Sequence, residues 1–169
     1  TNRDYTPFST NRDETLKKLC FEYGIEFIQK NDLLLIEPEH IATGNGTPYT
    51  IFTPFFKRAL QKPVTQPDNF TITNWYTKPI KETLDNIDQA FEPYNNIHIH
   101  VHGTATLAKT ILSSIDTFEN YNNTHDYPYI ETTNLSAYNK FGIVSIREVY
   151  HAIAQKLGQA SPIARQLYW

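Results

Sequence analysis

The sequence contains no methionine and only one cysteine, Cys20. A single cysteine excludes an intramolecular disulfide framework and favours a reducing compartment. No apolar run approaches the roughly 18 residues that cross a membrane, and the first twenty residues lack the apolar segment of a secretory signal. We therefore expect an intracellular protein of the cytoplasm or nucleus, neither secreted nor membrane-bound. Because methionine is missing even at position 1, we also expect the chain to be a processed product or an excerpt.

An excess of positive charge is also missing. The 169 residues carry a net charge of −3, which gives no global electrostatic argument for nucleic-acid binding and leaves only a local basic patch open. Hydrophobic residues make up 40% and aromatic residues 14% of the chain, so disorder is excluded as the overall class.

The first sixty residues have the rhythm of an α/β layer. Helical spacing predicts a helix over 13–23, and apolar runs at 25–28 and 33–36 predict two short strands. Another helix is expected after Pro54. The apolar face of the first predicted helix consists of Leu16, Leu19, Cys20 and Tyr23.

The remainder of the chain changes in character. Residues 63–93 are rich in proline and polar residues and are interpreted as a linker, with one helical turn around 80–87. From Thr104 the pattern is helical, with a stripe formed by Leu107, Ile111, Ile115 and Phe118. Residues 145–157 form the strongest predicted helix, with Ser145 and Glu148 as a capping box. A last helix opens at Ser161 and Pro162.

Two clusters of polar residues suggest binding chemistry. His98, His100 and His102 alternate along an extended segment, but they would span roughly 13 Å, too far for one zinc ion, so we expect no metal site. Residues 132–136 (TTNLS) lie just ahead of a short segment and a capped helix, and their hydroxyls and backbone amides suit an anion. From composition alone, an ordinary capping loop is favoured over an anion site.

Four motifs, in order, point to a known family. They are NRDYTP at 2–7 with Arg12 and Asp13, TGNGTPY at 43–49 with FTPF at 52–55, LSAYNKFG at 135–142 with SIREV at 145–149, and RQLYW at 165–169. Together they resemble the DNA photolyase/cryptochrome family over essentially the whole chain.

The resemblance implies an α/β fold followed by an all-α fold. Residues 1–60 would be the C-terminal part of a Rossmann-like antenna domain, 61–103 an interdomain linker, and 104–169 the first helices of a helical FAD-binding domain. It implies FAD as cofactor and a second antenna chromophore of undefined identity. Phe8 and Ser9 stand where some members use Asn and Glu for a folate antenna, which argues against folate.

The resemblance also assigns roles to individual residues. Tyr121 and the loop residues Thr132, Thr133, Asn134, Leu135 and Ser136 would hold FAD, with Asn134 in place of the usual arginine. Gln166 and Trp169 would be catalytic and would face the damaged base. Together with His125, which replaces a common arginine, they would also contact DNA.

The implied function is light-dependent DNA repair. Reduced FAD would donate an electron that splits a cyclobutane pyrimidine dimer in damaged DNA. We expect the chain to be incomplete, to bind FAD without useful affinity and to repair nothing alone, and complementary N- and C-terminal photolyase fragments are its expected partners. A blue-light photoreceptor of the cryptochrome type and a non-functional remnant are the alternatives.

Overall fold

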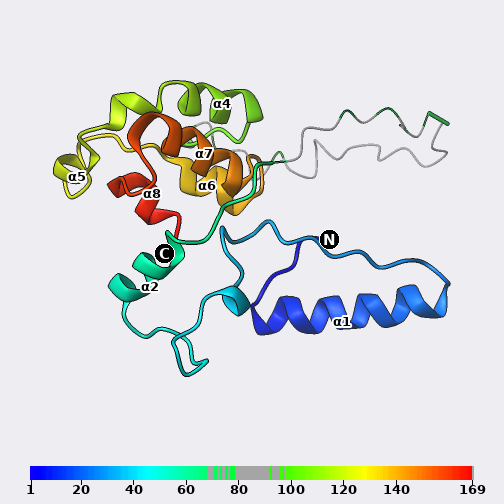
Figure 1. Cartoon of the computed structure of the whole chain (residues 1–169). Coiled ribbons are helices and arrows are strands. Elements are labelled where there is room, and N and C mark those ends of the chain that lie inside the picture. The colour runs from blue at the N-terminus through cyan, green and yellow to red at the C-terminus, as the bar shows by residue number, and fades with distance from the viewer. Residues whose placement is uncertain are drawn as a thin grey trace. The chain divides into compact units, whose positions relative to one another are not determined.

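The computed structural model describes residues 1–67, 71, 73, 75, 77, 78, 92, 96 and 98–168. The chain divides into two compact units, one comprising Thr1–Pro67 and Gly103–Trp169, and the other Asp68–His102. Much of the predicted linker, including its helical turn at 80–87, lies outside the described residues, as does Trp169. The helices of the first unit are α1 (Pro7–Glu22), η1 (Pro38–His40), α2 (Phe52–Ala59), α4 (Ala105–Ser113), η3 (Ile115–Phe118), α5 (Tyr121–Thr124), α6 (Leu135–Lys140), α7 (Ile146–Leu157) and α8 (Pro162–Gln166) (Figure 1).

Helix α7 is the centre of the C-terminal helices. It contacts η3, α4 and α8, while α5 packs on α8 and α4 on α6. Val149, Tyr150 and Ile153 form its buried face, as the sequence predicts. Ser145 caps the helix, but its Oγ accepts from the Arg147 N–H at 3.2 Å rather than from Glu148, so the predicted capping box is not formed.

The predicted stripe of Leu107, Ile111, Ile115 and Phe118 is buried only in part. Ile115 is completely buried and Ile111 and Phe118 are half-buried, whereas Leu107 is 42% exposed. Within α4 the buried residues are Ala108 and Leu112, each one position beyond a member of the stripe. The helix ends at Ser113, and the following η3 is a 3₁₀-helix with three residues per turn, so a stripe counted at 3.6 residues per turn does not continue unbroken across this boundary.

The N-terminal and C-terminal segments share one hydrophobic core. Its buried members are Leu35, Ile41, Ala59, Tyr150 and Tyr168, which come from both sides of the predicted linker. Aromatic rings extend this core, with Phe56 meeting Tyr168 edge-on at 5.3 Å between ring centroids. The predicted division at 61–103 stays a prediction, but the segments on either side of it pack together.

Helix α1 is longer than predicted, and its apolar face is not buried. It begins at Pro7 because Thr6 caps it, with Thr6 Oγ1 accepting from the Ser9 N–H at 3.3 Å. Leu19 is 49% exposed, and only Ser9 and Asp13 of this helix are buried. The expected buried face of Leu16, Leu19, Cys20 and Tyr23 is therefore wrong: Leu16, Leu19 and Tyr23 are exposed and Cys20 is half-buried.

The polar side of α1 makes the contacts instead. The Ser9 hydroxyl donates to Asp4 at 2.8 Å, and the Gln29 amide donates to Asp13 at 3.0 Å. Two extended segments that flank α1 pair in parallel at Asn2 and Lys30. The described residues form no longer strand, so the runs at 25–28 and 33–36 are not the strands that the sequence predicts.

Candidate functional site

The largest cavity described here is lined by residues from both halves of the sequence. Its volume is about 520 Å³, within the range typical of small-molecule sites. We call it the Tyr121 cavity. Its walls come from the 33–34 segment, α5, the 132–134 loop, α6, α7 and α8, through Leu33, Leu34, Tyr121, Thr132, Thr133, Asn134, Leu135, Ser136, Asn139, Lys140, Ile146, Val149, Ile153, Ile163, Gln166 and Leu167.

The loop at 132–136 reaches the cavity through a left-handed residue. Asn134 has φ 53°, which asparagine tolerates better than most residues, and it immediately precedes α6. The Leu135 N–H donates to Thr133 Oγ1 at 3.4 Å, which fixes the turn. Leu135 itself is buried, while Ser136 is exposed. This tight turn brings the hydroxyls of Thr132 and Thr133 and the side-chain amide of Asn134 to the cavity wall.

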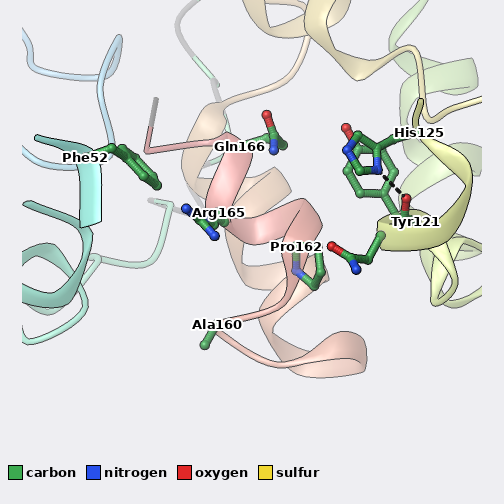
Figure 2. A pocket seen from close by; sticks show the side chains of 8 residues that line it. Phe52, Tyr121, His125, Ala160, Pro162, Arg165 and Gln166 are labelled. Atoms are coloured by element: carbon green, nitrogen blue, oxygen red, sulfur yellow. Dashed lines mark hydrogen bonds between the residues drawn. The ribbon is translucent and has the colours of Figure 1, made fainter. Parts of the chain in front are cut away.

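Tyr121 is held by His125 across one turn of α5. The two rings stack, with 5.0 Å between centroids and 21° between planes. His125 Nδ1 lies 2.9 Å from the Tyr121 carbonyl oxygen, the contact dashed in Figure 2. His125 Nε2 also lies 3.3 Å from Asp126 Oδ1. Histidine is thus oriented by acceptors at both ring nitrogens, and its ring supports Tyr121 from one side.

A second cavity of about 370 Å³ adjoins the first at Tyr121 and Gln166 (Figure 2). We call it the Arg165 cavity. The Arg165 guanidinium lies over the Phe52 ring at 4.9 Å from its centroid, a cation–π contact that joins α8 to α2. Its lining residues are Phe52, Tyr121, Asn122, His125, Ala160, Pro162, Arg165 and Gln166.

One polar atom in the wall of the Tyr121 cavity has no hydrogen-bond partner. Asn139 Oδ1 is buried, and nothing donates to it. A buried acceptor without a donor costs about 1–3 kcal/mol, so a ligand that brings a donor would be stabilised there. Lys140, at the same wall, adds a cationic group. The donor and acceptor set fits a polar ligand with both hydrogen-bond donors and negative charge.

The structure brings most of the predicted site residues together. Seven of them line the Tyr121 cavity: Tyr121, Thr132, Thr133, Asn134, Leu135, Ser136 and Gln166. His125 and Gln166 line the adjoining Arg165 cavity. Trp169 lies outside the described residues. The roles of these residues toward FAD and DNA stay predictions.

Other cavity residues carry no sequence signal of their own. Leu33 and Leu34 belong to an apolar run that suggests only a strand, and their place in the cavity follows from contacts made over a hundred positions away. Phe52 and Arg165 fall within the quoted motifs, yet nothing in the residues alone pairs them.

The described part of the chain contains no cluster of three or more histidine, cysteine or acidic side chains arranged for a metal ion. Among the same residues, no helix combines the length and the apolar character that crossing a bilayer requires.

Comparison with known proteins gives a consistent result. The sequence model of the DNA photolyase family matches residues 1–71. A deoxyribodipyrimidine photo-lyase of Halobacterium salinarum is 27% identical over 160 residues, which is 89% of this chain and 33% of that protein. One of Vibrio cholerae is 28% identical over 166 residues, which is 89% of this chain and 34% of that protein.

Solved structures agree with the sequence relatives. An archaeal photolyase from Sulfolobus tokodaii, described as containing two FAD molecules that imply a novel light-harvesting cofactor, matches 99% of this chain and 35% of its own, with a TM-score of 0.75 and 28% identity. A bacterial class III photolyase from Agrobacterium tumefaciens matches with a TM-score of 0.65 at 22% identity and supports the fold alone.

The fold is therefore that of photolyases. The chain is similar to DNA photolyases in sequence and in fold, and it spans 33% and 34% of the length of the two curated photolyases described above.

Proposed function

We propose that this chain is part of a light-dependent, FAD-containing DNA repair enzyme that splits cyclobutane pyrimidine dimers. One observation carries the proposal: seven residues assigned by family resemblance, separated by up to 45 positions, line a single cavity of about 520 Å³. Five of the seven are consecutive, and the fold brings Tyr121 and Gln166 to the same cavity from separate helices.

FAD is the proposed occupant of the Tyr121 cavity. Thr132, Thr133 and Ser136 would present hydroxyls to the pyrophosphate and ribityl groups, and Lys140 would add positive charge. Asn139 Oδ1, which lacks a donor, would accept a hydrogen bond from the cofactor. When bound and reduced, FAD supplies the light-driven electron for the repair reaction. The chain itself would bind and orient the cofactor and exclude water with the apolar wall of Leu33 and Leu34.

Damaged DNA is the proposed substrate, approached from the Arg165 cavity. Gln166 lines both cavities, which supports the proposal that it would contact a flipped-out base and the cofactor together. His125 would contact the DNA backbone, and Trp169 would stack on the base. Gln166 and Trp169 are the proposed catalytic residues.

The domain division is also a proposal. Residues 1–60 would complete an α/β antenna domain, 61–103 would form the linker, and 104–169 would begin the FAD-binding domain. The parallel pairing of Asn2 with Lys30 on either side of α1 supports an α/β unit, because a helical crossover is how parallel strands are joined. A second antenna chromophore would bind in a completed antenna domain.

Repair activity requires more than this chain. Since the matched photolyases are about three times its length, we propose that the chain is inactive alone and works with the remaining photolyase segments, in the same polypeptide or as complementary fragments.

Flavin titration tests the cofactor site. Quenching of FAD fluorescence should show weak, saturable binding, and replacing both Thr132 and Thr133 by valine should weaken it about tenfold because two hydrogen bonds are lost. Thr106→Val, an exposed position on α4 outside the cavity, is the matched control. Equal affinity in all three proteins would contradict the assignment of the cavity.

A chimera tests the activity. This chain would replace the aligned segment of the Halobacterium salinarum photolyase, and repair of dimer-containing oligonucleotides would be measured in blue light and in darkness. Light-dependent repair supports the proposal. A folded chimera that holds FAD and repairs nothing would contradict it and favour the photoreceptor alternative.

A further inference from the structure

Two faces of helix α7 make different contacts: one lines the Tyr121 cavity and the other carries polar side chains. Ile146, Val149 and Ile153 line the Tyr121 cavity. At 100° per residue, Arg147 and His151 lie roughly a third of a turn away from these three side chains. One helix thus forms part of the cavity wall and carries a separate polar face beside it.

Arg147 binds the N-terminal half of the chain through three groups. Its Nη1 lies 2.6 Å from Asp32 Oδ1, its Nη2 lies 3.8 Å from Glu37 Oε1, and its Nε donates to Thr65 Oγ1 at 3.3 Å. Ser145, which caps the same helix, donates to the same Asp32 oxygen at 3.0 Å. The Arg147 side chain is only 12% exposed, so these contacts are partly shielded from water.

His151, one turn further on, holds the adjacent segment. Its Nε2 lies 3.1 Å from the Thr65 carbonyl oxygen, and its Nδ1 lies 3.1 Å from Gln66 Nε2. A neutral ring with its proton on Nε2 satisfies both contacts, donating to the carbonyl and accepting from the amide. The polar face of α7 therefore binds residues 32–37 and 65–66 together.

Asp32 and Glu37 bracket the segment that carries Leu33 and Leu34. Both leucines line the Tyr121 cavity, and Leu34 also lines a further cavity. The described residues of this segment form no strand ladder with a neighbour, so its position depends on side-chain contacts: the packing of Leu35 in the core and the polar contacts of Asp32 and Glu37 at its two ends.

We propose that Arg147 is a positioning residue that fixes the Leu33–Leu34 wall of the Tyr121 cavity through its ion pairs with Asp32 and Glu37. Insofar as the ligand is FAD, this inference rests on the proposed function. Removing Arg147 would leave Glu37, whose side chain is 8% exposed, without its facing cation. The Tyr5 hydroxyl would then be the remaining partner of this buried carboxylate, and the cost of its uncompensated charge would be relieved by opening the segment toward water.

Thiol labelling tests the positioning role in the full chain. In a Cys20→Ser background, Leu35→Cys places a thiol at a site that is 5% exposed and next to the wall. Adding Arg147→Met should raise its labelling rate about tenfold, and Asp32→Asn should raise it less. Combining Arg147→Met with Asp32→Asn should add little to the first change, because both act on one pair.

Two controls separate a local effect from general destabilisation. Lys156→Met removes another ion pair of α7, the 2.9 Å contact with Asp116, and should leave labelling at position 35 unchanged. A second probe, Ala108→Cys, sits at a fully buried site of α4 and should stay protected in the Arg147 variants. Unchanged labelling at position 35, or equal loss of protection at both probes, would overturn the positioning role.

FAD titration of the same variants tests the link to the ligand. Arg147→Met should weaken FAD binding about tenfold, and Arg147→Lys, which keeps the charge, should retain part of it. If position 35 opens and FAD affinity is unchanged, the wall has no bearing on the ligand and that part of the inference fails. If position 35 opens and the folded chimera with the Halobacterium salinarum photolyase holds no FAD, the proposed function fails while the positioning role stands.

Discussion

Tyr5 illustrates how single residues tie the N-terminal segment to the loop behind it. Its hydroxyl donates to Glu37, the same carboxylate that faces Arg147. Burial and this hydrogen bond raise the pKa of Tyr5 to about 12 from its ordinary 10.0. The neutral phenol is therefore favoured in the folded chain, because an ionised Tyr5 would place a second negative charge against Glu37.

Alkaline titration should reveal this contribution. A phenol whose pKa is higher in the folded chain stabilises it fully below pH 10, and that stabilisation is lost as the pH rises from 10 to about 12. We expect Tyr5→Phe to be less stable at pH 8 and to lose less stability over that interval. Urea denaturation at a series of pH values measures both. Tyr168, whose pKa is also raised by burial, contributes to the loss that remains. Parallel curves for the two proteins would contradict the role of Tyr5.

At the level of elements, the sequence predicts best those helices that have both a capping residue and a regular apolar spacing. The predicted helix 145–157 is found as Ile146–Leu157, and Ser161 caps α8 by accepting from the Ala164 N–H at 3.3 Å. Both have a cap residue and apolar positions that agree with their packing. Here the local and tertiary preferences coincide.

Helix α1 shows where the same reasoning fails. Its start carries a cap signal, Thr6 followed by Pro7, like the Ser161 and Pro162 pair of α8. Apolar spacing begins only at Leu16, and placing the helix by that spacing misses the first turns. Spacing also predicts burial, but burial needs a partner surface, which no local pattern supplies. Asp13, a charged residue, is buried because Arg12 and Gln29 satisfy it.

Truncation of two aliphatic side chains should distinguish the two environments. Ile115 is completely buried in η3, so Ile115→Ala should cost about 2–5 kcal/mol of unfolding free energy through lost contacts and a cavity. Leu16 is 40% exposed on α1, and Leu16→Ala should change stability by less than about 1 kcal/mol. Urea denaturation followed by circular dichroism compares them. A similar cost at both sites would mean that α1 is buried in solution.

At the scale of the whole molecule, contacts between residues far apart in the chain determine the core and the cavity, which local sequence patterns do not predict. The cavity and the core combine residues near position 35 with residues near 150, and no local pattern indicates that pairing. The candidate site was accessible from the sequence only through the family motifs. Composition alone favoured an ordinary capping loop for residues 132–136, because hydroxyls that cap a helix and hydroxyls that bind a ligand have the same local sequence.

A shared core implies joint unfolding of residues 1–67 and 103–168. We expect one sharp thermal transition, with far-ultraviolet dichroism and the near-ultraviolet tyrosine signal changing together. Phe56→Ala, which removes the ring that meets Tyr168 at 5.3 Å, should lower the midpoint of both signals equally. Two separated transitions would contradict a single core, and a broad, non-cooperative loss would support the remnant alternative.

The contact between Arg147 and Asp32 also has an evolutionary consequence. The two residues are 115 positions apart in the chain, yet their charged atoms lie 2.6 Å from each other. A mutation that neutralises one of the two residues leaves the other charge without its partner. Selection therefore acts on the pair rather than on either position alone. Among relatives that keep both segments, positions 32 and 147 should change together, and each lineage should carry the two charges or neither.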